Sequence, residues 1–217
     1  MTYPPSTELG ADTSRYPLWE ATVPFPAFDE MPDLPVVTHV IVEQAQPGGF
    51  HYLHEATLAW HQGVLFLGWA NHPTVEINVT DEVIRGRQSK DGLTWGPAAT
   101  WAAAPLTGGQ SFNHPLLFAH AGTLWGFFTR WEDGRPRSEI FVRDDTRGAW
   151  ELVGAHLPGF LPFRPPLRLP TGNWIMSGEL HWWEAAVALS HGDDLTRWDL
   201  VQIPRPESIT LLFPETT

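Results

Sequence analysis

A short turn sequence that ends in tryptophan occurs three times along the chain, and its spacing constrains the fold more than any other feature. The first copy, residues 89–95 (Ser-Lys-Asp-Gly-Leu-Thr-Trp), combines an aspartate that can accept nearby backbone amides with a glycine that tolerates positive φ. The Thr-Trp pair that follows favours a strand. Weaker copies span residues 143–150 and 190–198, and the three final tryptophans lie 55 and 48 residues apart. This spacing indicates similar units of about 50 residues.

A second landmark, a glycine turn inside an apolar hairpin, keeps nearly the same spacing. Gly63, Gly122 and Gly172 are separated by 59 and 50 residues. Several short strands per unit at this period are typical of a β-propeller, so we predict an all-β fold of four-stranded antiparallel blades. Each blade would run from an inner strand through the glycine turn to a second strand, then through a polar loop to a third strand and through the aspartate turn to an outer strand. A β-sandwich with coincidental turns is the alternative, and two landmarks in phase argue against it.

The repeat also predicts the domain organisation. The blades are expected at residues 50–106, 107–159 and 160–206, with the start of a further blade at residues 207–217. Closed propellers have about four to eight blades, so we expect about three blades of a truncated ring of roughly six or seven. The remaining blades of the propeller, or self-association, would cover its open edges. Residues 1–34 would be a proline-rich lead-in to the partial propeller of residues 35–217.

The composition agrees with an all-β protein and excludes several kinds of partner. Twelve Trp, twelve Phe, 21 Pro and 19 Gly suit aromatic-packed strands joined by many turns. The absence of cysteine excludes disulfides and thiolate metal sites. A net charge of −12 argues against nucleic acid or an anionic membrane as a partner. Since neither a signal peptide nor a membrane span is visible, we expect a cytoplasmic protein, or an extracellular one if the N-terminus is incomplete.

Polar side chains are predicted to gather on one rim of the propeller. The aspartate turns occupy one rim, so the entries to the inner strands and the loops between second and third strands meet at the other. These positions hold Tyr52, His54, Glu55, Asn71 and His72 in the first unit, Asn113, His114 and Arg130 in the second, and Arg164, Glu179, His181 and Trp182 in the third. Polar groups that recur at equivalent places amid apolar strands predict a binding site.

No metal or cofactor is expected at this site. His51 and His54 have the spacing of a ligand pair, but residues three apart in a strand point to opposite faces. The His54-Glu55 pair is not followed by a second histidine at the spacing of a zinc protease. Three further histidines fall in turns, where we expect them to be solvated: His61, His120 and His191.

Three stretches resemble proteins of the sialidase superfamily, whose propellers carry Asp-box (BNR) repeats. They are residues 54–60 (His-Glu-Ala-Thr-Leu-Ala-Trp), 89–95 and 111–115 (Ser-Phe-Asn-His-Pro), and the resemblance covers residues 40–217. It implies an exo-acting glycosidase that holds the carboxylate of an acidic sugar with arginines and uses a Tyr–Glu nucleophile pair and an aspartate acid/base. Tyr52 and Glu55 would be that pair. Residues 163–165 (Phe-Arg-Pro) partly match the Phe-Arg-Ile-Pro motif of the family's first arginine.

The histidines of the same rim resemble those of propeller enzymes that act on rhamnose–uronate linkages, the ulvan-type polysaccharide lyases and related rhamnosidases. This resemblance implies a β-elimination in which His114 removes a proton from a uronate and Arg130 neutralises its carboxylate. Three functions are left open: a glycosidase acting on an acidic oligosaccharide or polysaccharide, a uronate lyase, and a non-catalytic glycan-binding propeller. For an enzyme the catalytic candidates are His54, Glu55, His72 and His114, and the other rim residues would bind substrate.

Overall fold

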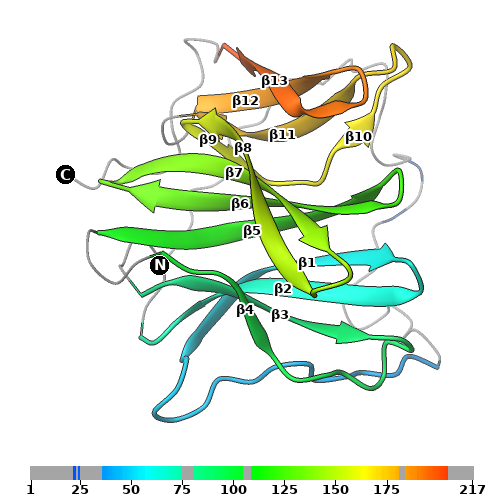
Figure 1. Cartoon of the computed structure of the whole chain (residues 1–217), viewed down its shortest axis with the longest axis vertical. Helices are drawn as coiled ribbons and strands as arrows, with labels where there is room; N and C mark the ends of the chain where they lie inside the picture. Colours follow the sequence, from blue (N-terminus) through cyan, green and yellow to red (C-terminus); the bar gives the residue numbers. More distant parts are fainter. Residues whose placement is uncertain are drawn as a thin grey trace. The chain divides into compact units, whose positions relative to one another are not determined.

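The computed structural model describes residues 22, 24, 36–74, 81–104, 109–180 and 184–204. The chain consists of two compact units, and the second, which begins at Val40, contains every strand described (Figure 1). The further blade expected at residues 207–217 and most of the expected lead-in lie outside the described residues. Within the described part, no helix is long and apolar enough to cross a lipid bilayer.

Three antiparallel sheets follow one another along the chain (Figure 1). The first pairs β1 (Tyr52–His61), β2 (Val64–His72), β3 (Val83–Ser89) and β4 (Ala99–Ala102) in that order. The second repeats the order with β5 (Gln110–His120), β6 (Thr123–Glu132), β7 (Arg135–Asp144) and β8 (Ala149–Pro158). The third contains β9 (Phe160–Pro162), β10 (Leu167–Arg168), β11 (Trp174–Leu180), β12 (Glu184–His191) and β13 (Asp194–Gln202). The prediction of an all-β fold with four-stranded antiparallel units is confirmed for these residues.

The inner strand of the third sheet is interrupted, and the sequence explains why. β9 and β10 pair with opposite ends of the same neighbour, β11, and residues 163–166 between them contain two prolines. Proline has no amide hydrogen to donate to a ladder. The Phe163 amide still donates to the Ser177 carbonyl at 2.9 Å, so the chain keeps its course beside β11. β9 and β10 together are therefore the equivalent of β1 and of β5.

Aromatic and aliphatic side chains fill the two spaces between neighbouring sheets. Phe66, Trp101 and Phe128 lie between the first and second sheets, and Phe127 and Phe160 lie between the second and third. Phe127 and Phe128 are adjacent in β6 and point to opposite faces, so one strand contributes to both layers. Full burial of a side chain of this size is worth about 1.5–3 kcal/mol, which makes these layers the main source of stability.

Two glycines paired across β2 and β3 make room for the ring of Trp101. Gly68 and Gly86 are direct neighbours in the ladder, and the indole of Trp101 lies against both. A Cβ atom would come within 2.1 Å of the indole at Gly86 and within 2.6 Å at Gly68. Because the interior is close-packed, a side chain at either position would displace the tryptophan from the layer between the sheets.

The aspartate turn at residues 89–95 is held by one carboxylate. Asp91 accepts hydrogen bonds from the backbone amides of Leu93 and Thr94 at 2.9 and 2.7 Å. The Thr94 amide is the largest of the causes that lower the pKa of Asp91 from 3.8 to about 2. The turn therefore depends on the ionised form of this carboxylate.

The two weaker copies of the turn form equivalent contacts. Asp144 and Asp194 each accept hydrogen bonds from the amide and hydroxyl of a threonine two residues further on, Thr146 and Thr196. The threonine hydroxyls are the leading cause that holds the pKa of both carboxyls below the usual range. The tryptophans that end the turns, Trp95, Trp150 and Trp198, pair with Ser89, Arg143 and Ser190 on the third strand of each sheet. The three turns are structurally equivalent, as their spacing predicted.

Two of the histidines expected to be solvated instead join neighbouring sheets. His61, at the end of β1, is only 5% exposed, and its Nε2 lies 2.9 Å from Asp145 Oδ2 in the β7–β8 turn. His120, at the corresponding end of β5, lies 3.6 Å from Asp193 in the β12–β13 turn. The expectation for His61 was wrong because the turn of one sheet reaches over the end of the preceding sheet. His191, the third of these residues, is exposed.

Replacing Asp91 with asparagine should lower the stability of the protein in a pH-dependent manner. Since the folded pKa is about 2 and the ordinary value is 3.8, the carboxylate contributes stability above pH 3.8 that is lost as the pH falls towards 2. The melting temperature of the variant should lie below that of the wild type near neutral pH, and the difference should narrow in acid. Thermal melts followed by circular dichroism measure this difference in melting temperature. Asp133→Asn, in a hairpin turn that asparagine also suits, is the control.

Replacing Gly86 with alanine should destabilise the first sheet by about 1–3 kcal/mol, the usual cost of overpacking. The added methyl would overlap the indole of Trp101, which is itself buried between two sheets. Gly96→Ala is the matched control, because the nearest atom to its Cβ would be the Gln88 carbonyl oxygen at an ordinary 3.5 Å. Urea unfolding of both variants measures the difference. Equal stability of the two variants would show that Trp101 is not confined as described.

Candidate functional site

The pairing registers place the strand ends at two rims. β1 begins where β2 ends, with Tyr52 opposite His72, and β5 begins where β6 ends, with Gln110 opposite Glu132. The aspartate turns lie at the other ends of the same sheets. The rim that holds Tyr52 and Gln110 is called the site rim below, and the rim that holds the aspartate turns is called the turn rim.

A β-bulge interrupts each of the first two inner strands close to the site rim. In β1 the register with β2 shifts between His54 and Thr57, and Glu55 between them has φ of 56°. In β5 the register with β6 shifts between Asn113 and Pro115, and His114 has φ of 46°. A bulge breaks the alternation of a strand and redirects its side chains. The inner strands of the first two sheets, β1 and β5, thus carry the same irregularity at corresponding positions.

Five side chains meet at these bulges in a closed ring of contacts, called the rim cluster: His54, Glu55, Glu82, Asn113 and His114. His54 Nε2 lies 2.7 Å from Glu82 Oε1, and His54 Nδ1 lies 3.6 Å from Glu55 Oε1. Glu55 contacts His114 twice, at the ring Nε2 and at the backbone amide, which donates at 2.8 Å. Asn113 closes the ring: its Oδ1 lies 2.9 Å from His114 Nδ1, and its Nδ2 donates to Glu82 Oε2 at 3.2 Å.

Glu82 is the member of the rim cluster that sequence reasoning missed. It directly precedes β3, its side chain is fully buried, and its carbonyl accepts the amide of Phe112 from the second sheet at 3.0 Å. A buried carboxylate is costly unless it is hydrogen-bonded and close to a cation, and its two oxygens contact His54 and Asn113. Its sequence surroundings, Thr-Asp-Glu-Val, carry no signal beyond that of an ordinary loop.

The partners of His114 determine where its ring carries hydrogens. The indole of Trp131 donates to Asn113 Oδ1, so this oxygen is an acceptor, and the His114 Nδ1 that faces it must carry a hydrogen. The other ring nitrogen, Nε2, faces the carboxylate of Glu55, which in its ionised form only accepts. Both ring nitrogens therefore face oxygen atoms, an arrangement that suits a doubly protonated imidazole. A doubly protonated imidazole can supply a proton but has no lone pair with which to remove one.

The rim cluster is partly open to solvent. The side chains of Glu55 and His114 are 24% and 22% exposed, whereas that of His54 is 12% exposed. The ring of Tyr52 packs edge-on against His54, with centroids 5.1 Å apart. A pocket of about 350 Å³ adjoins His54 and Glu55 and is also lined by Trp69. Glu55 and His114 are thus the members that a ligand can reach most easily.

The histidine and glutamate side chains of the rim cluster are of kinds that transfer protons. Among the described residues, no group of three or more His, Cys, Asp or Glu side chains is placed to hold a metal ion. The two carboxylates and two imidazoles of the rim cluster contact one another in alternation. A carboxylate in contact with an imidazole is a common arrangement for general acid–base chemistry.

Asn71 and His72, two residues expected at the site, support the end of the first sheet instead. Asn71 is fully buried, accepts the indole of Trp69 at 2.9 Å and donates to the Tyr52 carbonyl at 3.2 Å. His72 is also buried, and its Nδ1 accepts the Thr74 amide at 3.1 Å, which closes the turn after β2. Asn71 lies opposite Leu53 in the ladder, one position away from His54, and successive residues of a strand face opposite sides.

Arg130 belongs to a second set of contacts, called the arginine network: Gln110, Arg130, Glu132, Arg137 and Glu139. Its guanidinium donates to Gln110 Oε1 and lies 3.4 Å from Glu139. Glu139 also accepts from Arg137 at 2.8 Å, and Arg137 lies 3.9 Å from Glu132. Gln110 donates to Glu132 and so completes the network. These contacts hold the Arg130 guanidinium near the site rim, and its expected contact with a substrate stays a prediction.

The remaining expected residues lie in or near the third sheet. Arg164 is exposed in the interruption between β9 and β10, and Glu179 lies in β11 opposite Leu161. His181 and Trp182 lie outside the described residues. Of the residues that the sequence suggested, the structure brings four together in the rim cluster: His54, Glu55, Asn113 and His114.

Comparison with known proteins identifies the fold. No protein-family model matches the sequence, and no curated protein matches it either. Among solved structures, a family 117 glycoside hydrolase of the marine bacterium Zobellia galactanivorans matches with a TM-score of 0.56 at 15% identity, over 76% of this chain and 60% of that chain. A family 43 β-1,3-galactosidase matches with a TM-score of 0.52 at 13% identity, over 70% of this chain and 61% of that chain. The three sheets are therefore blades of a β-propeller, as predicted.

The chain spans about 60% of the length of these two structures. At identities this low, the likeness shows the fold and does not transfer an activity. A sialidase of Trypanosoma rangeli matches with a TM-score of only 0.48 at 14% identity, over 68% of this chain and 27% of that chain. That match gives no support to the sialidase resemblance of the sequence.

Replacing Glu82 with alanine should lower the free energy of unfolding by about 2–4 kcal/mol. The change would leave buried donors of His54 and Asn113 without an acceptor, which costs about 1–3 kcal/mol per group. Glu132→Ala is the control, because its side chain is 43% exposed and exposed ion pairs contribute little. Chemical denaturation measures both variants. A loss no greater than that of the control would mean that the rim cluster does not hold the first two blades together.

Proposed function

We propose that this protein is a carbohydrate-active enzyme that cleaves a glycosidic bond, with Glu55 and His114 in contact with the substrate. The observation that carries the proposal is the Glu55–His114 pair: a partly exposed carboxylate held by both the backbone amide and the imidazole of a histidine on the neighbouring blade. Both residues sit on β-bulges with positive φ at the site rim. Strained positions that present polar groups are characteristic of active sites.

The pair can supply both proton transfers that hydrolysis requires. When a glycosidic bond breaks, the leaving oxygen takes a proton and a hydroxyl from water ends on the anomeric carbon. His114 in its protonated form would donate the proton to the leaving oxygen. Glu55 would accept a proton from the attacking water and return it to His114 through their contact, which restores the starting state.

The proposed substrate is an acidic oligosaccharide or polysaccharide. Three arginines, Arg130, Arg135 and Arg137, lie at the site-rim ends of β6 and β7, although the chain as a whole carries a net charge of −12. Guanidinium groups pair with carboxylates in planar, two-pronged contacts. The sequence resemblance adds the proposal that the enzyme is exo-acting, with Tyr52 beside His54 at the entry of the inner strand.

A uronate lyase would use the same rim with a different first step. Elimination requires a base that removes the proton next to the carboxylate. Both ring nitrogens of His114 face oxygen atoms, those of Asn113 and Glu55, which favours its use as an acid over its use as that base. Hydrolysis is therefore the function that the geometry of the rim cluster supports best.

Replacing Glu55 with glutamine should reduce glycosidic-bond cleavage by about 10²–10⁴-fold, since an amide cannot accept the proton from water. Release of reducing sugar from a panel of acidic oligosaccharides measures hydrolysis, and the ultraviolet absorbance of an unsaturated uronate product measures elimination. Glu151→Gln, a change of the same kind in the exposed part of β8, should leave activity unchanged.

Two results would contradict the proposal. Full activity of the Glu55→Gln variant would remove this carboxylate from the mechanism. Glycan binding by the wild type without either product would favour the non-catalytic, glycan-binding function.

A further inference from the structure

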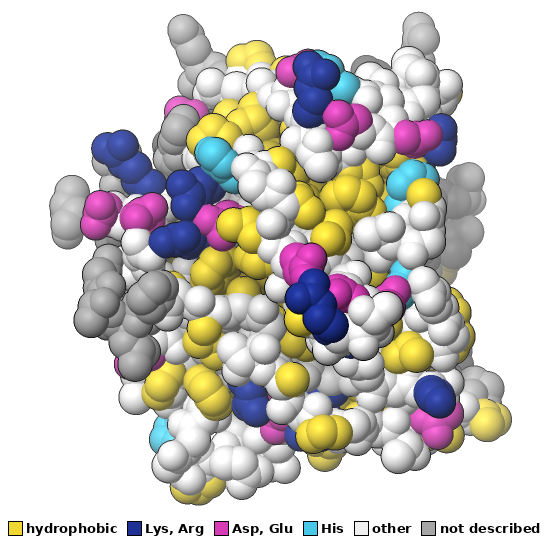
Figure 2. Space-filling view, in the orientation of Figure 1, with side chains coloured by type: hydrophobic (Ala, Val, Ile, Leu, Met, Phe, Trp, Pro, Cys, Tyr) yellow, Lys and Arg dark blue, Asp and Glu magenta, His cyan; other side chains and the backbone are white. Residues whose placement is uncertain are grey.

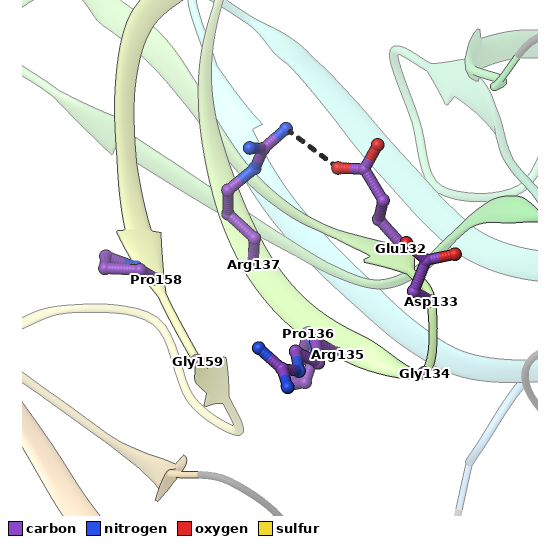
Figure 3. A pocket seen from close by; sticks show the side chains of 8 residues that line it. All are labelled: Glu132, Asp133, Gly134, Arg135, Pro136, Arg137, Pro158 and Gly159. Atoms are coloured by element: carbon purple, nitrogen blue, oxygen red, sulfur yellow. Dashed lines mark ion pairs between the residues drawn. The ribbon is translucent and has the colours of Figure 1, made fainter.

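A large pocket opens at the site rim of the second blade, beside the turn that leads to the third (Figure 3). It has a volume of about 1300 Å³ and is lined by the β6–β7 hairpin and the β8–β9 turn. The lining residues are Glu132, Asp133, Gly134, Arg135, Pro136, Arg137, Pro158 and Gly159. None of these residues belongs to the rim cluster.

The walls of this pocket are held by backbone geometry. Asp133 and Gly134 have φ of 52° and 71°, the left-handed pair that a two-residue hairpin turn requires. On the opposite wall, the Gly159 amide donates to the Pro136 carbonyl at 2.9 Å and ties the β8–β9 turn to β7. The ligand-facing side chains are therefore presented by a rigid frame, which reduces the entropy lost on binding.

Arg135 and Arg137 line the same pocket but differ in their surroundings. Arg137 points towards Glu132, with which it forms an ion pair, and it also binds Glu139 (Figure 3). Arg135 is exposed, points towards the Pro158–Gly159 turn and forms no ion pair with any of the residues the structure describes (Figure 3). Arg135 is thus a pocket cation that is not neutralised within the described part of the protein.

The charges around the pocket are mixed. Figure 2 shows arginine and acidic side chains together over the ends of β6 and β7, on the face drawn there. Sugars present many hydroxyls, which can both donate to carboxylates and accept from guanidinium groups. Glu132 and Arg137 can therefore bind sugar hydroxyls. Arg135 can then bind a negatively charged group.

We propose that this pocket is a second glycan subsite, in which Arg135 binds an anionic substituent of the sugar chain, a carboxylate or a sulfate ester, while Glu132 and Arg137 contact sugar hydroxyls. The proposal rests on the proposed function and assigns the recognition of the acidic group to Arg135. Planar oxyanions accept two parallel hydrogen bonds from one guanidinium, which a single ammonium group cannot reproduce.

The pocket and the rim cluster are linked through the second blade. Gln110 donates to Glu132 in the pocket and lies three residues before Asn113 in the same strand, a separation of roughly 10 Å. The indole of Trp131, next to Glu132, donates to Asn113 Oδ1 in the rim cluster. One oligosaccharide of a few sugar units can therefore reach both the pocket and the rim cluster.

Calorimetric titration tests the proposal with three probes: a short oligogalacturonide, its carboxyl-reduced neutral form, and a sulfated galactose oligosaccharide. The wild type should bind at least one anionic probe about tenfold or more tightly than the neutral form. Arg135→Gln should lose this preference, and Arg135→Lys should recover only part of it because lysine lacks the planar fork. Arg197→Gln, which removes the same charge from an exposed position of β13, should behave as wild type.

The outcomes separate this proposal from the preceding one. Equal binding of all three probes by the wild type, no binding of either anionic probe, or an unchanged preference in Arg135→Gln, would overturn the subsite. A preference for the carboxylate probe or for the sulfated probe supports the subsite and identifies its ligand. If the Glu55→Gln variant loses cleavage but keeps its preference for the anionic probes, the rim cluster and the subsite act independently. Cleavage that persists in Glu55→Gln would contradict the catalytic proposal and leave the subsite standing.

Discussion

Close packing of the first two blades is the constraint on which the candidate site depends. The Thr57 hydroxyl of β1 accepts the Leu117 amide of β5 at 3.0 Å, and the Glu82 carbonyl accepts the Phe112 amide at 3.0 Å. These bonds cross from one sheet to the next beside the bulges, above a layer that includes Trp101. Because a close-packed interior does not yield gradually, the inner strands are held at one separation. The rim cluster exists only at that separation.

The two bulges introduce unfavourable backbone conformations at the candidate site. Non-glycine residues with positive φ are unfavourable by about 1–3 kcal/mol each, and Glu55 and His114 both adopt such a conformation. Their side chains are also more exposed to solvent than those of His54 and Glu82, so a ligand can reach them more easily. The contact between them, and the buried hydrogen bonds of Glu82, offset this strain. Backbone irregularity and the placement of reactive groups therefore coincide.

The site rim contains two polar networks, the rim cluster and the arginine network. The rim cluster joins the first and second blades through histidines and glutamates, whereas the arginine network lies within the second blade. Asn113 accepts from Trp131, whose neighbour Glu132 belongs to the arginine network, so the two networks meet along β5 and β6. This arrangement concentrates arginine on one part of a chain of net charge −12, as the proposed binding of an acidic glycan requires.

Local patterns were enough to predict the four-stranded repeat and the turns, because aspartate turns and glycine hairpins depend on φ preferences and on bonds within a few residues. The repeat in turn placed His54, Glu55, Asn113 and His114 at strand entries. Which of these side chains touch was decided by contacts between distant residues: Glu82 lies 28 positions from His54, and Asp145 lies 84 positions from His61. No local pattern records such pairs, since they arise only when one blade packs on the next. For the same reason neither Glu82 nor the contacts of Arg130 with Gln110 and Glu139 could be predicted from the sequence.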